Sequence, residues 1–153
     1  MKTFTLLASA LAVSVGSLAL ADGHGNVDPA VKARQAHMQL YAHNIGILGD
    51  MAAGKADYDA TAAQTAADNM VALISINQQS YWPVGTDNAS IEGTKTLPAL
   101  WENFDNVMAI GADFGAAADA MAEVAGTDLE SLQGAMRDLG GSCSACHREY
   151  RAR

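Results

Sequence analysis

The stretch DLESLQGAMRDLGGSCSACHREY, residues 128–150, decides how this chain folds. Its apolar residues recur at alternating steps of three and four, which is the spacing of a helix face that packs in a bundle. Asp128 is placed to cap the start of that helix. Gly140-Gly141 weakens it by about 1 kcal/mol per glycine relative to alanine, so we expect something bulky to lie close to the backbone there. The apolar face consists of Leu129, Leu132, Met136, Leu139, Cys143, Cys146 and Tyr150.

The end of the same stretch has the pattern C-x-x-C-H, Cys143 to His147. Two thiols three positions apart on a helical turn reach the two vinyl groups of one porphyrin and form thioethers with it. The adjacent imidazole then points at the iron from the same face. We therefore predict one covalently attached haem c, bound through Cys143 and Cys146, with His147 as an iron ligand.

Three other uses of the cysteines remain open at this point. A thioredoxin-like dithiol is expected beside a βαβ pattern, and this one lies near the end of a helical chain. A zinc site needs about four ligands, and His24, His37 and His43 form no second ligand pair with the usual spacing. A structural disulfide would make the neighbouring histidine accidental.

Three further helical patterns precede this stretch. The first begins with an Asp28 cap and a proline at its first position, and ends near Gly54. The second follows residues 57–59 and runs to residue 82, because Pro83 disfavours helical geometry in the residue before it. A glycine-containing loop from 84 to 96 crosses the end of the bundle, and a third helix starts near 96 and ends before 126.

The chain has no long run in which β-branched and polar residues alternate, so no strand competes with the helices. Four helices with three connections predict an all-α, antiparallel four-helix bundle. The helix faces are rich in alanine and glycine and contain few Leu, Ile or Phe. We therefore expect a core organised around a large apolar group that the polypeptide does not supply.

Residues 1–21 have the features of an export signal. Lys2 supplies the positive start, an apolar run follows from Leu6 to Leu20, and residues 19–21 give the small-x-small pattern of a cleavage site. Cleavage before Asp22 leaves residues 22–153 as one bundle domain with no membrane span. This predicts a periplasmic protein.

The balance of acidic and basic residues limits the classes of partner that the protein is expected to bind. Seventeen acidic residues against nine basic ones give a formal net charge of −8. Such a surface repels nucleic acid and anionic lipid, and it suits a soluble protein that meets cationic partners. The net negative charge can also be explained by solubility alone, without any partner.

The position of the C-x-x-C-H pattern at the end of an all-helical chain resembles the class II c-type cytochromes, the cytochrome c′ family. Residues 141–151 are similar to that family's closing helix. Residues 32–38 resemble its first helix, in which an arginine lies four residues before a residue on the distal face. The likeness spans the chain after residue 21 and is loosest between 84 and 97.

The resemblance implies roles for individual residues. His147 would be the proximal ligand, Arg34 would lie near the haem propionates with Gln35 assisting, and Met38 would lie over the distal face of the iron. Arg151 resembles the basic residue that the family keeps near the proximal imidazole.

The resemblance leaves the coordination of the iron open. A Met38 thioether opposite His147 would close the site and suit electron transfer. Without that bond, the haem would be five-coordinate and would bind nitric oxide or carbon monoxide. Met38 could also be core filling. His37 and His43 are rival sixth ligands, and we expect both to face solvent.

These observations predict a one-electron carrier, not an enzyme, that exchanges electrons with periplasmic redox proteins. The alternative is a gas-binding cytochrome c′. Tyr81 and Trp82 either cover a haem edge or simply pack. A homodimer through the first two helices is neither demanded nor excluded by the sequence.

Overall fold

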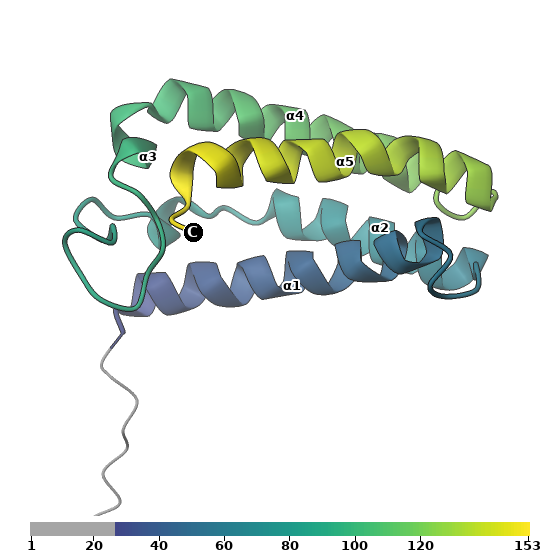
Figure 1. Ribbon diagram of the computed structural model, residues 1–153, viewed down its shortest axis with the longest axis horizontal. Coiled ribbons are helices and arrows are strands. Elements are labelled where there is room, and N and C mark those ends of the chain that lie inside the picture. The colour runs from purple at the N-terminus through teal and green to yellow at the C-terminus, as the bar shows by residue number, and fades with distance from the viewer. Residues whose placement is uncertain (1–26) are drawn as a thin grey trace, which may run out of the picture.

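A computed structural model of the chain describes residues 27–153, and the predicted signal at 1–21 lies outside them. These residues form an antiparallel four-helix bundle in which successive helices pack on one another and the last packs on the first (Figure 1). The predicted all-α bundle is confirmed. Its four long helices are α1 (Pro29–Ala52), α2 (Ala60–Ser75), α4 (Phe104–Val124) and α5 (Leu129–Tyr150).

The first and last helices start where the sequence predicts. The Asp28 carboxylate accepts a hydrogen bond of 2.8 Å from the backbone N–H of Ala30, and proline takes the first helical position. The Asp128 carboxylate accepts one of 2.8 Å from the backbone N–H of Ser131. Each side chain satisfies a donor that the helix itself leaves without a partner.

The predicted second helix is too long. It ends at Ser75 rather than at residue 82, and Ile76 is extended. The Asn77 carboxamide oxygen accepts a hydrogen bond of 3.0 Å from the backbone N–H of Gln79, and this local turn competes with the helix. A short 3-10 helix, η1 (Gln79–Tyr81), follows.

The predicted start of the third helix at residue 96 is also wrong. Thr96 instead forms an isolated β-bridge with Arg151, and the backbone N–H of Leu97 donates to the Tyr150 carbonyl at 2.9 Å. Because the C-terminus takes these backbone groups, helix begins only at α3 (Ala99–Glu102). The backbone breaks again at Asn103, before α4. We call residues 76–98, between α2 and α3, the crossing loop.

The packed core occupies one half of the bundle. It lies away from the crossing loop, between the end of α1, the middle of α2, the end of α4 and the first half of α5. The other half, which includes the start of α1, the crossing loop and the end of α5, has fewer buried apolar side chains. Within residues 27–153, no helix combines the length and apolarity needed to cross a bilayer. The largest fully buried side chains are Leu48, Met70, Met121, Leu132, Leu139 and Val31.

Candidate functional site

A cavity of about 300 Å³ lies in the half of the bundle that the core leaves open. Its walls come from the first turns of α1, the crossing loop, α3 and the last turns of α5. The lining contains no Asp or Glu. The lining residues are Arg34, Gln35, Met38, Gln39, Trp82, Thr94, Lys95, Thr96, Leu100, Cys146, His147, Tyr150 and Arg151.

The C-x-x-C-H pattern lies on an unbroken part of α5. Cys143 and Cys146 are half-buried, separate thiols, and burial raises the pKa of each. Cys146 and His147 line the cavity, and Cys143 lies one turn earlier on the same helix. The helix therefore presents the thiols and the imidazole in the order that haem attachment requires.

The His147 imidazole is exposed along the cavity wall. The part of the ring that lies against the wall is removed from water, which lowers the pKa of His147, and the nearby Arg151 guanidinium lowers it further. Both effects favour the neutral imidazole, which is the form that binds a metal.

Met38 lines the same cavity from α1 and is half-buried. It also packs against the core. The structure thus brings the side chains of Met38 and His147, which are more than one hundred residues apart, to the walls of one cavity.

Arg34 lines the cavity too, but its hydrogen bonds go to the crossing loop. Arg34 is 3% exposed, and its guanidinium donates to the backbone and side chain of Thr86 and to the side chain of Thr94. Gln35 donates from Nε2 to the Gly93 carbonyl at 2.6 Å. Gly93 has a φ of +81°, and a Cβ there would lie 2.9 Å from Val27, so this turn requires glycine. The two residues expected near the propionates therefore also fasten the loop to α1.

His37 is buried, which corrects the expectation that it faces solvent. It is 5% exposed, its ring centroid lies 4.6 Å from that of Tyr41 and 5.8 Å from that of Tyr81, and its Nε2 has no hydrogen-bond partner. Burial lowers its pKa. His37 does not line the cavity, and His43 is exposed as expected. Position 37 shares a helix face with Asn44, which turns toward α2 and hydrogen-bonds Asn69.

Sequence reasoning considered Trp82, which lines the cavity, but missed the threonines of the crossing loop. Thr86 and Thr94 bind Arg34 across 52 and 60 residues of chain, and no local pattern signals such a contact. Lys95 and Thr96 reach the cavity because their backbone pairs with the C-terminus. The backbone N–H of Ala152 donates to the Lys95 carbonyl at 2.8 Å.

The other uses of the cysteines find no support in the part of the chain that the structure describes. Residues 27–153 form no strand, only the single bridge, so the surroundings of a thioredoxin-like motif are missing there. The same residues contain no group of three His, Cys, Asp or Glu that could hold a metal ion by themselves.

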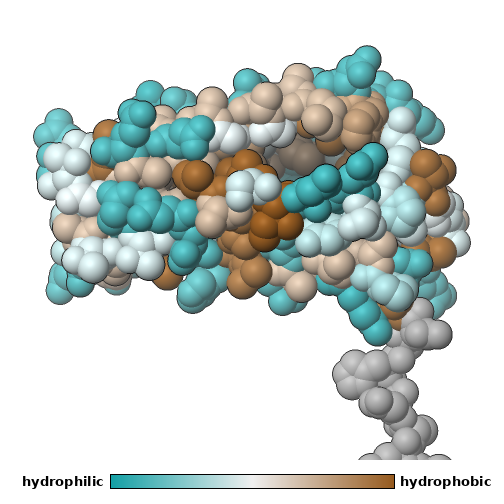
Figure 2. Space-filling view, turned by 180° about the vertical axis from the view of Figure 1, so that it is seen from behind, coloured by the Kyte–Doolittle hydropathy of each residue, from teal (hydrophilic) through white to brown (hydrophobic). Residues whose placement is uncertain are grey.

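The cavity and its surroundings fit a porphyrin. A Cβ placed on Gly140 or Gly141 would meet no atom within 4 Å, so no contact within residues 27–153 requires glycine at either position. Figure 2, which shows the molecule from behind the view of Figure 1, shows a hollow in that face with apolar side chains on one side of it and hydrophilic side chains on the other. The chain does not close its own interior in this half.

Comparison with known proteins decides the family. The family model described as Cytochrome C′ matches residues 29–151. The chain belongs to the cytochrome c′ family. Cytochrome c-554 of Cereibacter sphaeroides is 41% identical over 133 residues, which cover 87% of each chain.

Solved structures support the same assignment. A cytochrome c′ from Rhodobacter Spheriodes is 31% identical with a TM-score of 0.81, and the match covers 84% of this chain and 99% of that one. A cytochrome c′ described as having an unusual ligand-controlled dimer dissociation is 29% identical with a TM-score of 0.73, over 81% of this chain and 95% of that one. Members of the family bind a covalently attached haem c, so the cofactor of this cytochrome c′ family protein is haem c.

Proposed function

We propose that this cytochrome c′ family member carries single electrons with one haem c that is bound through Cys143 and Cys146. His147 and Met38 are the axial ligands. The observation that supports this most directly is that Met38 on α1 and His147 on α5 line one cavity. An imidazole and a thioether on opposite faces of a haem are a ligand pair of electron-transfer cytochromes.

The bound haem supplies a one-electron couple. Of the side chains that line the cavity, Met38 would hold the sixth position of the iron, and Trp82 and Leu100 would supply apolar surface beside the haem. Arg151 favours the neutral form of His147. In this proposal the protein transfers electrons and does not catalyse a reaction of a bound substrate.

The attachment site has a direct test. Trypsin cuts after Arg137 and Arg148, so the peptide 138–148 contains both cysteines and His147. We expect mass spectrometry of the digested holoprotein to find this peptide carrying one haem. A bare 138–148 peptide, or haem on another peptide, would remove Cys143 and Cys146 from the proposal.

Carbon monoxide separates electron transfer from gas binding, the second function considered for this family. When carbon monoxide is added to the reduced protein, a haem closed by the Met38 thioether should keep its visible spectrum. An immediate carbonyl spectrum would instead assign the protein to the gas-binding, five-coordinate class.

Cytochrome c′ homologues are typically periplasmic, and we propose the same location for this protein, with periplasmic redox proteins as partners. Cleavage before Asp22 predicts a mature N-terminus at that residue, which intact mass of protein from a periplasmic extract checks. We also propose a homodimer through α1 and α2, by analogy with the relative whose dimer dissociates under ligand control. Sedimentation velocity of the holoprotein tests that assembly.

A further inference from the structure

The guanidinium of Arg34 makes an unusual number of contacts for one side chain. Its Nη1 donates to Thr86 Oγ1 at 2.7 Å and to the Tyr81 carbonyl at 3.3 Å. Its Nη2 donates to the Thr86 carbonyl at 2.5 Å and to Thr94 Oγ1 at 2.6 Å. All four N–H groups of the two terminal nitrogens are thus used, and every acceptor belongs to the segment 81–94.

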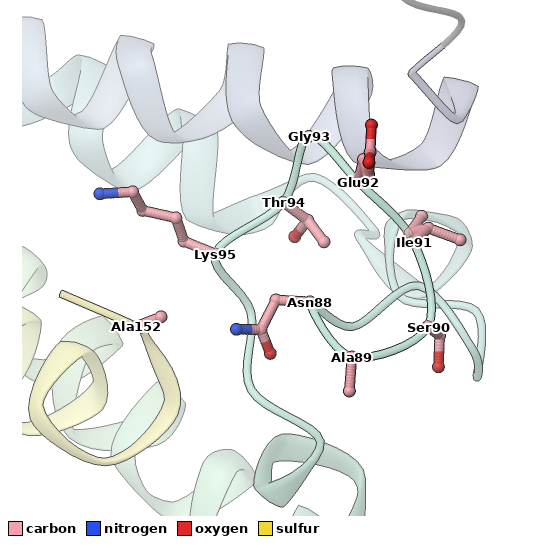
Figure 3. A pocket seen from close by; sticks show the side chains of 9 residues that line it. All are labelled: Asn88, Ala89, Ser90, Ile91, Glu92, Gly93, Thr94, Lys95 and Ala152. Carbon is pink, nitrogen blue, oxygen red and sulfur yellow. The ribbon is translucent and has the colours of Figure 1, made fainter.

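Thr86 and Thr94 are in turn hydrogen-bonded to other residues of the loop. Thr86 Oγ1 donates in turn to the Pro83 carbonyl at 2.8 Å. Thr94 Oγ1 accepts from the backbone N–H of Thr96 at 3.2 Å. Figure 3 shows Gly93 and Thr94 beside α1, with the rest of the loop extending away from the helix. One side chain of α1 therefore holds both ends of a loop segment in which residues 88–90 are exposed.

Trp82 is held between this cluster and α3. The Arg34 guanidinium carbon lies 5.1 Å from the centroid of the Trp82 ring, within the range of a cation–π interaction. The Trp101 indole N–H donates to the Trp82 carbonyl at 3.1 Å. The Trp82 side chain in turn lines the cavity.

The charge of Arg34 is balanced by carboxylates that it does not hydrogen-bond. Asp28 and Asp87 favour the charged guanidinium, while burial lowers its pKa. Asp87 itself accepts from the backbone N–H groups of Ala89 and Ser90 and from the Ser90 hydroxyl. The hydrogen-bonding capacity of Arg34 is therefore directed at neutral groups of the loop and leaves only Nε for another acceptor.

We propose that Arg34 is a positioning residue that clasps the crossing loop onto α1 and thereby fixes the Trp82 indole as the wall that keeps water from the haem. This inference rests on the proposed placement of the haem in the cavity. It does not depend on whether Met38 ligates the iron. It differs from a role as a charge beside the propionates, because a clasp needs the planar, multidentate guanidinium and a charge does not.

The decisive comparison is between Arg34→Lys and Arg34→Gln in the holoprotein. Lysine keeps the positive charge but cannot reproduce four hydrogen bonds in a fixed plane. We expect both variants to speed hydrogen exchange of the loop amides 86–96 by about tenfold or more, since several hydrogen bonds are lost. We also expect both to lower the reduction potential, because water at the haem favours the ferric state.

A wild-type potential and wild-type loop exchange in Arg34→Lys, with changes only in Arg34→Gln, would overturn the clasp and establish a role for the charge alone. Trp82→Ala tests the second step of the proposal, in which the Trp82 indole keeps water from the haem. It should lower the potential while the loop amides stay protected, and combining it with Arg34→Lys should lower the potential no further. A fully additive double variant would show that Arg34 does not act through Trp82.

A matched control is available at the other end of the bundle. Gln64 on α2 makes three hydrogen bonds, to Asp68, to the Ala122 carbonyl and from the Gly126 N–H. Gln64→Ala should loosen residues 122–128 and leave the reduction potential unchanged. A potential change in this control would mean that general loosening, rather than the clasp, moves the potential. The peptide and carbon monoxide experiments, which test the proposed function, are independent of all these outcomes.

Discussion

In the proposed function, Met38 is the residue that distinguishes electron transfer from gas binding. Substituting it with alanine removes the thioether from the cavity wall, and we expect the iron to change from low-spin to high-spin. Visible absorption and electron paramagnetic resonance of the oxidised protein measure the change.

Met136 provides the control for this substitution. It is also half-buried and packs against the core, but it does not line the cavity. Met136→Ala should lower stability and leave the spin state unchanged. An unaltered spin state in Met38→Ala would remove Met38 from the ligands.

Leu132 tests the packed half of the bundle. It is fully buried in the core cluster, so Leu132→Ala should lower the free energy of unfolding by about 2–5 kcal/mol. The visible spectrum should stay unchanged, because the residue lies away from the cavity. Guanidinium denaturation followed by far-UV circular dichroism measures the loss.

The control for Leu132 is Met108 on α4, which is 58% exposed and lies outside the proposed dimer helices. Met108→Ala should change the same free energy by less than about 0.5 kcal/mol. If both variants lost the same free energy of unfolding, the burial of these side chains in the structure would not describe their burial in the holoprotein.

Individual residues differ in how far the sequence predicted their surroundings. Cys143, Cys146 and His147 form a local pattern whose spacing alone implies haem attachment. Arg34 was predicted at the cavity, but its loop partners were not, because they lie 47 to 60 residues away along the chain. The prediction that His37 faces solvent was wrong, because one face of α1 packs on α2 and the His37 ring is buried on that face.

At the scale of the helix, the start of α5 depends on a titrating cap. Hydrogen bonds from Ser131 hold the pKa of Asp128 below its usual value. A carboxyl whose pKa is lower in the folded state stabilises the fold above the unfolded pKa, and this contribution is lost as the pH falls through the folded pKa. Stability should therefore decrease below about pH 4.

Asp128→Asn isolates this effect, because asparagine also caps helices but does not titrate in this range. We expect the stability of the variant to depend less on pH than that of the native protein in acid, measured by thermal unfolding between pH 3 and pH 6. Parallel pH profiles would show that Asp128 is not the titrating group.

Helix boundaries were predicted well where a cap is local and badly where a distant partner competes. The starts of α1 and α5 depend on Asp28 and Asp128, whose acceptors lie within three residues of the donors. The start of α3 depends on the pairing of residues 95–97 with the last turn of the chain. No periodicity in the sequence contains that information.

For the whole molecule, the separation of a packed half from an open half predicts how the protein responds to loss of haem. A chain expressed without haem attachment should keep slow hydrogen exchange in the core half, around Met70, Met121 and Leu132. The half that contains the crossing loop should exchange rapidly, because its interior lacks a large apolar group.

Hydrogen exchange with mass spectrometry compares the two forms directly, with the holoprotein as reference. Uniform protection in both halves of the haem-free chain would contradict this expectation. Uniform loss would show that the core half does not fold without the cofactor.

The sequence predicted this architecture from composition as well as from periodicity. Helix faces rich in alanine and glycine implied an interior that the chain does not fill. The structure places that deficit in one half only, because Leu48, Leu132 and Leu139 gather in the other. The position of the open half depends on how the helices are aligned along one another, and the periodicity of a single helix does not specify that alignment.

The pairing of residues 95–97 with residues 150–152 ties the stability of the loop to the end of α5. The two walls of the cavity come from α1 and α5, which are far apart in the sequence, and residues 150–152 fasten the loop that lies between them. A change at residues 150–152 would therefore act on both the loop and the cavity, although these residues are distant from the loop along the chain.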